Sequence, residues 1–186
     1  LSAIIPYFFL HPNFPTSAKA WTTDLNGQWD MGRLYLYGAG NDADSILWWS
    51  RVPMMLLTLL FGWLFFRWVR GRYGAEVGIL SLFFFVLSPT FIAHGRYVTT
   101  DVAAAFAFFI GIASFLWFLE RATYARAAWA GAVLGTALLL KFSTVLLLPL
   151  DALFALTWLF VAHFEDLRRR GWGAAVIRYM RHLLRL

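Results

Sequence analysis

The chain of 186 residues contains no cysteine, and only 14% of its residues are charged. Without cysteine it has no disulfide bond, no thiolate nucleophile and no cysteine-based metal site. With so few charged residues against 61% hydrophobic ones, it lacks the polar shell that a soluble domain of this size needs. The apolar composition therefore predicts a polytopic α-helical membrane protein rather than a soluble domain.

The formal net charge of +6 does not indicate a nucleic-acid partner. The basic residues stand beside apolar runs, and membrane topology accounts for that placement. Leu1 begins inside an apolar stretch, and no signal peptide with an n-region and a cleavage site is recognised. We therefore expect the natural chain to start upstream of Leu1.

Five apolar runs have about the length that a bilayer crossing needs, because about 20 helical residues rise about 30 Å. The predicted spans are residues 46–66, 77–93, 102–119, 127–140 and 142–163, the last one bent or broken around Pro149. Residues 11–45 are mixed polar and aromatic and predict an outer loop. We thus expect an all-α transmembrane bundle that forms one domain over residues 1–186.

The charges in the connections predict the orientation of these spans. Residues 67–72 carry three arginines, and residues 164–186 carry six arginines against two acids, whereas residues 91–101 are neutral. The positive-inside tendency places the arginine-rich connections in the cytoplasm. Loop 11–45 and residues 91–101 are then outside. Residues 168–186 have the spacing of an amphipathic helix on the cytoplasmic surface, and a basic flank behind the last span is the alternative.

A short polar break, residues 88–101, separates two uncharged runs and carries His94, Arg96 and Asp101. Charges at a membrane rim are unfavourable and usually mark a site. Arg96 suits a phosphate, because a guanidinium donates two parallel hydrogen bonds; an arginine that extends to lipid headgroups is the alternative. For Asp101, capping of the third span competes with a role as ligand or metal contact. His94 has no second histidine at metal-binding spacing, so an ordinary polar role is favoured.

Two further ionisable residues lie beside or within apolar runs. Lys141 is predicted at the outer end of the fourth span, level with Arg96, and two cations at one depth predict a phosphate-binding pair. A lone lysine that extends to the headgroups is the alternative. Asp151 lies inside the fifth span, where it either pairs with a cation of a span outside this sequence or is neutral.

Three motifs follow one another along the chain. They are Gly40-Asn41-Asp42 with Arg51-Val52-Pro53; Ser88-Pro89 with Ala93-His94-Gly95-Arg96 and Thr99-Thr100-Asp101; and Gly135 with Leu140-Lys141-Phe142-Ser143. Over residues 38–150 the chain thereby resembles bacterial members of the dolichyl-phosphate-mannose protein mannosyltransferase family, which have the C-type glycosyltransferase fold. The resemblance implies an inner-membrane enzyme that passes a sugar from a polyprenyl-phosphate donor to a protein or glycolipid acceptor on the outer face.

The resemblance also implies roles for individual residues. Arg96 corresponds to the outer-loop arginine of the family and Lys141 to the lysine near the donor phosphate. His94, Thr100 and Asp101 are then expected to line the site. No cofactor is implied with certainty, no metal ligand is assigned, and a divalent metal stays open.

The family's acidic pair, which supplies the catalytic base, has no counterpart in this sequence and is expected upstream of Leu1. Asp24 and Asp30 lie in the corresponding loop but match no motif. His11-Pro12 is similar to the start of the family's His-Pro-Pro stretch, with Asn13 in place of the second proline. These departures leave the catalytic residue unassigned.

Two other classes of protein remain as alternatives: a transporter or lipid flippase, and a non-catalytic membrane scaffold. A transporter needs polar groups deep within its spans and is usually built from repeats. Asp151 is the one acid deep within a predicted span, and the sequence shows no internal repeat. The transferase is therefore favoured.

Overall fold

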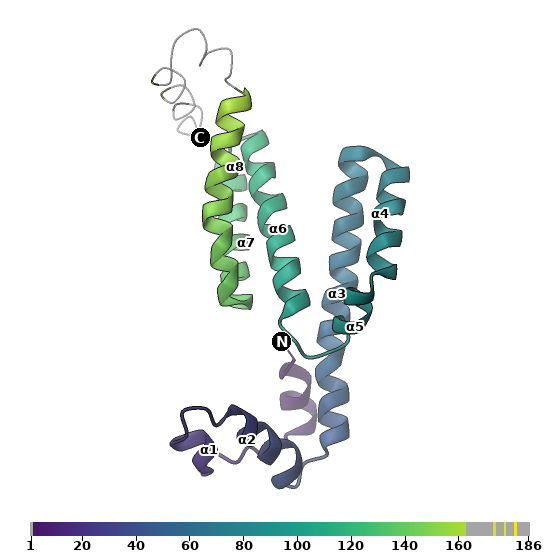
Figure 1. Ribbon diagram of the computed structural model, residues 1–186, viewed down its shortest axis with the longest axis vertical. Coiled ribbons are helices and arrows are strands. Elements are labelled where there is room, and N and C mark those ends of the chain that lie inside the picture. The colour runs from purple at the N-terminus through teal and green to yellow at the C-terminus, as the bar shows by residue number, and fades with distance from the viewer. Residues whose placement is uncertain (1, 163–172, 174–176, 178–180, 182–186) are drawn as a thin grey trace. The chain divides into compact units, whose positions relative to one another are not determined.

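The computed structural model describes residues 2–162 together with Gly173, Ile177 and Arg181. Every element in this described part is helical, so the predicted all-α class is confirmed (Figure 1). The chain separates into two compact units, Leu1–Thr99 and Thr100–Leu186. The predicted amphipathic tail, residues 168–186, falls almost entirely outside the described residues.

The first unit contains a helical hairpin made of α3 (Ala43–Tyr73) and α4 (Ala75–Leu87) (Figure 1). Gly74 joins the two helices at a φ of 92°, a conformation that glycine adopts without strain. The helices approach closely at Gly62, where an added Cβ would lie 2.9 Å from the Phe85 ring. The rings of Phe61, Phe85 and Phe91 fill the space beside this contact, with Phe85 and Phe91 stacked at 4.2 Å.

The helices that contain the first two predicted spans end at other residues than the predicted apolar runs. Helix α3 has 31 residues and continues past the predicted end at 66 through three arginines, because nothing in residues 67–73 breaks a helix. The second span does not run unbroken to residue 93. Helix α4 ends at Leu87, and a separate short helix, α5 (Pro89–His94), follows. Pro89 lacks an N–H and restricts Ser88 to an extended backbone, which ends α4.

The residues before α3 form short helical segments. They are Pro6–Leu10, α1 (Lys19–Thr22), α2 (Gln28–Arg33) and Leu34–Gly38. The two ends of the predicted loop are joined by Asn41, whose amide nitrogen donates to the carbonyls of Asn13 at 2.8 Å and Tyr35 at 2.6 Å. The Asn41 amide oxygen in turn accepts from the Asn13 backbone N–H at 2.8 Å. The asparagine of the first motif therefore closes the loop.

Asp42, the next residue, caps α3. Its carboxylate accepts hydrogen bonds from the Ser45 backbone N–H at 3.1 Å and from the Ser45 hydroxyl at 2.6 Å. These bonds lower the pKa of Asp42 below its ordinary value. The first motif thus has a structural role: Asn41 closes the loop and Asp42 starts the helix.

The second unit consists of α6 (Asp101–Glu120), α7 (Tyr124–Leu140), a short 3₁₀ segment (Phe142–Leu146) and α8 (Leu147–Ala162). Figure 1 shows α7 returning beside α6, and α8 packs against α6 as well. Leu147, Ala107 and Ala137 are fully buried at the centre. Leu147 fits against Gly111, where an added Cβ would lie 2.8 Å from the leucine side chain. The helix changes type at Leu147, so Pro149 lies in the first turn of α8, where its missing N–H breaks no bond.

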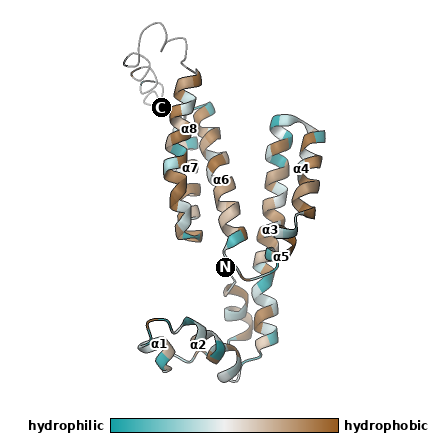
Figure 2. Cartoon of the chain, in the orientation of Figure 1, coloured by the Kyte–Doolittle hydropathy of each residue, from teal (hydrophilic) through white to brown (hydrophobic). Residues whose placement is uncertain are grey.

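Three segments of the described chain are long and apolar enough to cross a membrane by length and composition: Ala43–Tyr73, Asp101–Glu120 and Phe142–Val161. The helices Ala75–Leu87 and Tyr124–Leu140 are apolar but shorter. Figure 2 shows hydrophobic residues along most of α4, α6 and α8. A multi-pass membrane protein is therefore confirmed, whereas the number of five crossings stays a prediction.

Candidate functional site

The part of the polar break just after α5 is held against the middle of α3. The Thr58 hydroxyl lies 2.9 Å from the Met54 carbonyl oxygen and 3.2 Å from the Gly95 carbonyl oxygen, to either of which it can donate. A Cβ on Gly95 would lie 2.5 Å from the Phe91 carbonyl oxygen and 3.0 Å from the Thr58 methyl group. Because it has no side chain, Gly95 lets the chain approach α3 closely here. This contact also fixes the position of the backbone at the next residue, Arg96.

Two arginines converge on one aromatic ring just beyond this contact. The guanidinium carbon of Arg96 lies 5.1 Å from the centroid of the Tyr97 ring, and that of Arg51, from α3, lies 5.9 Å from the same centroid. The Arg96 guanidinium also donates to the Tyr97 hydroxyl at 3.3 Å. These distances are those of cation–π contacts.

No carboxylate in the described chain forms an ion pair with Arg51 or Arg96. Arg96 and Tyr97 are exposed, and Arg51 is half-buried. Each of the two guanidinium groups thus lies within about 6 Å of the centroid of one ring and is not neutralised by a described carboxylate, an arrangement that suits an anionic ligand. The sequence did not single out Arg51 as a member of the site. Its signal was present, since Arg51 is the one charged residue within the predicted first span.

Lys141 is bound within the second unit by Asp101. The Lys141 ammonium nitrogen lies 2.9 Å from the Asp101 carboxylate oxygen, and the two side chains are 34% and 60% exposed. Lys141 ends α7, and the fully buried Thr144 hydroxyl holds that end, since it lies 2.6 Å from the Lys141 carbonyl oxygen and 2.7 Å from that of Ala137. An exposed ion pair of this kind contributes only about 0.2–1 kcal/mol.

This ion pair bears on the role of Asp101. Asp101 is the first residue of α6, as expected, and its negative charge suits a helix N-terminus. Its carboxylate, however, bonds to Lys141 across the unit. Thr100 occupies the N-cap position but its side chain makes no capping hydrogen bond. Arg96 belongs to the first unit and Lys141 to the second, so their pairing at one phosphate remains a prediction.

The remaining candidate residues, His94 and Asp151, do not belong to a metal-binding cluster within the described part of the chain. His94 is exposed at the end of α5. Within residues 2–162 and the three described tail positions, no three His, Asp or Glu side chains gather to hold a metal ion. Asp151 is 7% exposed on α8, one turn beyond Leu147, and one of its carboxylate oxygens is buried without a partner among the described residues. Asp151 therefore lies within the helix of the last predicted span, and both predicted alternatives for its charge stay predictions.

The chain matches the family model of dolichyl-phosphate-mannose-protein mannosyltransferase over residues 41–177. This match covers well over half of the sequence. The chain belongs to this mannosyltransferase family. No curated protein and no solved structure matches it. Membership places the protein among the membrane glycosyltransferases and confirms the resemblance that the motifs indicated.

The match to the mannosyltransferase family contains the arginine pair around Tyr97 and the ion pair of Lys141 and Asp101. It begins at Asn41, the residue that joins the two ends of the predicted loop. The short helices of residues 6–38 lie before it. The two charged groupings therefore lie within the family match, and the preceding loop lies outside it.

Proposed function

We propose that this protein transfers a sugar from a polyprenyl-phosphate donor to a protein or glycolipid acceptor on the outer face of the bacterial inner membrane. Family membership supports sugar transfer, and the apolar helices support a multi-pass membrane location. The observation that carries the proposal is the convergence of the Arg51 and Arg96 guanidinium groups on Tyr97. A phosphate on a membrane lipid is the anion that such a site would meet.

The chemistry of this transfer explains why cations are needed. The bond between the anomeric carbon and the donor phosphate oxygen breaks, and its electron pair stays on the phosphate. The acceptor oxygen forms the new bond and gives its proton to a base. Guanidinium groups lower the barrier where they bind the departing phosphate more strongly than the intact donor. Arg96 and Arg51 fit this role, and no residue described here is assigned as the base.

Lys141 is proposed as a third cation at the same phosphate. Its ammonium now bonds to the Asp101 carboxylate, which a phosphate oxygen would replace. Because the ion pair is exposed, this exchange requires little free energy. His94, Thr100 and Asp101 would then line the site beside the three cations.

The proposal is tested with membranes that contain the intact protein and a labelled polyprenyl-phosphate sugar. Arg96→Ala should abolish transfer of the label, by about 100-fold or more, while expression stays normal. Arg67→Ala is the matched control, because Arg67 also lies over an aromatic ring, that of Trp63 at 5.2 Å, and belongs to the other end of α3. Wild-type transfer by Arg96→Ala would refute the assignment.

A lipid flippase is the second candidate, and the buried carboxylate of Asp151 favours it. Buried acids within membrane helices often belong to transport pathways. A flippase moves a lipid between leaflets without forming a glycosidic bond. Recovery of the label in the unchanged donor lipid, now accessible on the opposite leaflet, would support the flippase and exclude transfer.

A further inference from the structure

The loop before the family match contains a cavity of about 400 Å³, here called the outer-loop pocket. Its volume is within the range of about 300–1,000 Å³ that is typical of small-molecule sites. It is lined by Phe14, Ala20, Trp21, Asp24, Leu25, Gly27, Gln28, Met31, Gly32 and Tyr35. The arginine pair and the ion pair of Lys141 do not contribute to it.

The walls of the outer-loop pocket are fixed by close packing. Helices α1 and α2 meet at Gly27, where an added Cβ would lie 2.1 Å from the Ala20 carbonyl oxygen. Met31 is 7% exposed and belongs to the lining. Asn41 holds the two ends of the loop together. The pocket is therefore a built feature of the loop.

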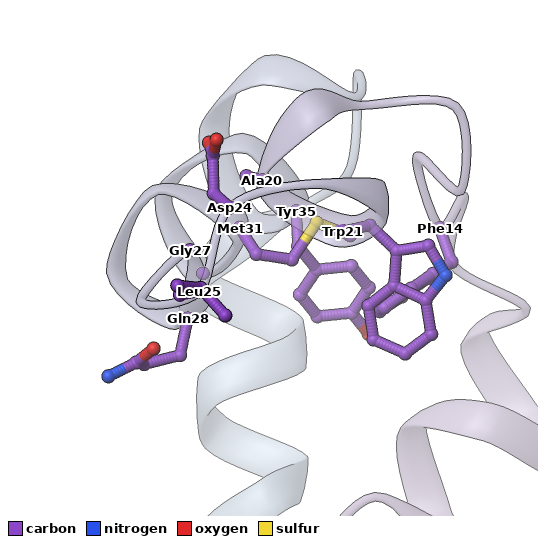
Figure 3. Close-up of a pocket in the computed structure, with 10 residues that line it drawn as sticks. Phe14, Ala20, Trp21, Asp24, Leu25, Gly27, Gln28, Met31 and Tyr35 are labelled. Atoms are coloured by element: carbon purple, nitrogen blue, oxygen red, sulfur yellow. The ribbon is translucent and has the colours of Figure 1, made fainter.

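One side of the outer-loop pocket is aromatic. The Phe14 ring lies edge-on to Trp21 at 5.1 Å and is tilted against Tyr35 at 5.6 Å. Figure 3 shows these three rings grouped together, with the Met31 side chain beside them. Trp21 is 58% exposed, so much of its indole surface is available to a ligand. Burial raises the pKa of Tyr35, so its hydroxyl keeps its proton and remains a donor.

The other side of the outer-loop pocket is polar. Figure 3 shows the Asp24 carboxylate and the Gln28 amide there, both extending away from the rings. Both residues are exposed, and their side chains bond to no residue of the described chain. They can therefore rotate onto a ligand that lies against the rings. The pocket combines a flat apolar surface with a carboxylate and an amide.

We propose that the outer-loop pocket binds a pyranose ring. The C–H face of a pyranose is apolar and packs on an indole, and its hydroxyl groups bond to carboxylate and amide oxygens at the rim. A lipid chain would pack on the rings without using the polar groups of Asp24 and Gln28. If the proposed function holds, the pyranose is either the sugar of the donor or a sugar of the acceptor. Only this assignment of the sugar rests on the proposed function; the binding itself does not.

Binding is measured first, without any transfer reaction. The intact protein in nanodiscs is titrated with the methyl glycosides of mannose, glucose, galactose and N-acetylglucosamine, and saturation-transfer difference spectra report contact. At least one glycoside should bind with a Kd near 1 mM. Trp21→Ala and Asp24→Asn should each weaken that binding by about tenfold or more, and thermal melts show that the variants fold.

Trp29→Ala is the matched control. Trp29 is 82% exposed on α2 and does not line the outer-loop pocket. If the exposed aromatic residues of this loop serve only as membrane anchors, Trp29→Ala will alter glycoside spectra as much as Trp21→Ala does. That result overturns the proposal, as does the absence of binding by every glycoside. Preferential binding of phosphocholine also overturns it, since aromatic rings attract its quaternary ammonium group.

The transfer assay then separates the two sources of the sugar. Trp21→Ala should raise the KM for one substrate and leave kcat unchanged, because Trp21 is proposed to bind the sugar and is not one of the groups proposed to take part in the reaction. A raised donor KM assigns the pocket to the donor sugar, and a raised acceptor KM assigns it to the acceptor. Transfer absent from wild type with glycoside binding intact would refute the proposed function and leave the pyranose site standing.

Discussion

The two ends of α3 use arginine and aromatic side chains in different ways. Toward Gly74, each arginine lies over a ring one turn earlier in the same helix: Arg67 over Trp63, Arg70 over Phe66 and Arg72 over Trp68. Toward the opposite end, Arg51 and Arg96 share the single ring of Tyr97. The first arrangement is what membrane anchors need, since each charge has its own support. The second gathers charge in one place and is open to an anion.

Lys141, in the second unit, shows a third arrangement. Lys141 is neutralised by Asp101 at 2.9 Å, whereas no described carboxylate neutralises Arg51 or Arg96. A basic residue at a helix end is therefore not enough to identify a phosphate site. Whether its charge is available to a phosphate depends on whether a carboxylate of the protein already neutralises it.

A charge exchange at the ion pair should have the largest effect in the second unit. In Asp101→Lys with Lys141→Asp, the two charges can still attract, so the free energy of unfolding should change by no more than about 1 kcal/mol. Transfer should nevertheless fall by about 100-fold if Lys141 has the role proposed for it, because the exchange replaces the proposed phosphate-binding cation with a carboxylate. Thermal melts and the labelled-donor assay measure the two quantities. Transfer at the wild-type rate would show that Lys141 only stabilises the fold.

Gly95→Ala should disturb the first unit through packing. Its new Cβ would meet the Phe91 carbonyl oxygen at 2.5 Å, and overpacking of this kind lowers stability by about 1–3 kcal/mol. Because Arg96 follows directly, transfer should fall as well. Gly71→Ala is the control, since nothing lies within 4 Å of an added Cβ there. Equal melting temperatures for the two variants would show that the close approach at Gly95 is not required.

Tyr97→Phe should have the smallest effect. The ring that both arginines contact remains, and one hydrogen bond of 3.3 Å from Arg96 is lost. A bond of this length contributes about 0.5–1.5 kcal/mol, so transfer should fall by about tenfold or less. Tyr97→Leu removes the ring too and should reduce transfer further. Steady-state kinetics distinguishes the two variants, and equal losses would show that the ring itself does not hold the arginines.

Much of the fold follows from the sequence because long apolar runs specify helices directly. The predicted span 102–119 differs from α6 by one residue at each end. Helix ends that lie beyond an apolar run were harder to predict. Residues 67–73, for example, continue α3 although they carry three arginines. The end of α4 at Leu87 depends on one proline, Pro89, whose effect outweighed the apolar residues after it.

The site was predicted only in part, because its contacts join distant positions. Arg96 and Lys141 could be selected as cations beside apolar runs. The bond between Lys141 and Asp101 joins residues 40 apart, and Arg51 reaches the ring of Tyr97 from another helix. No helical periodicity relates such pairs. The outer-loop pocket was not foreseen either, since the two helices that line it, α1 and α2, have only four and six residues.

The central claim is that Arg51 and Arg96 bind one phosphate together. The most direct measurement is a double-mutant cycle on the binding of a short-chain prenyl phosphate to the intact protein, with Arg51→Ala, Arg96→Ala and the double variant. Each single variant should weaken binding, and the double variant should lose less than the two losses combined, because the arginines share one ligand. Additive losses, or binding that neither substitution changes, would contradict a common phosphate site.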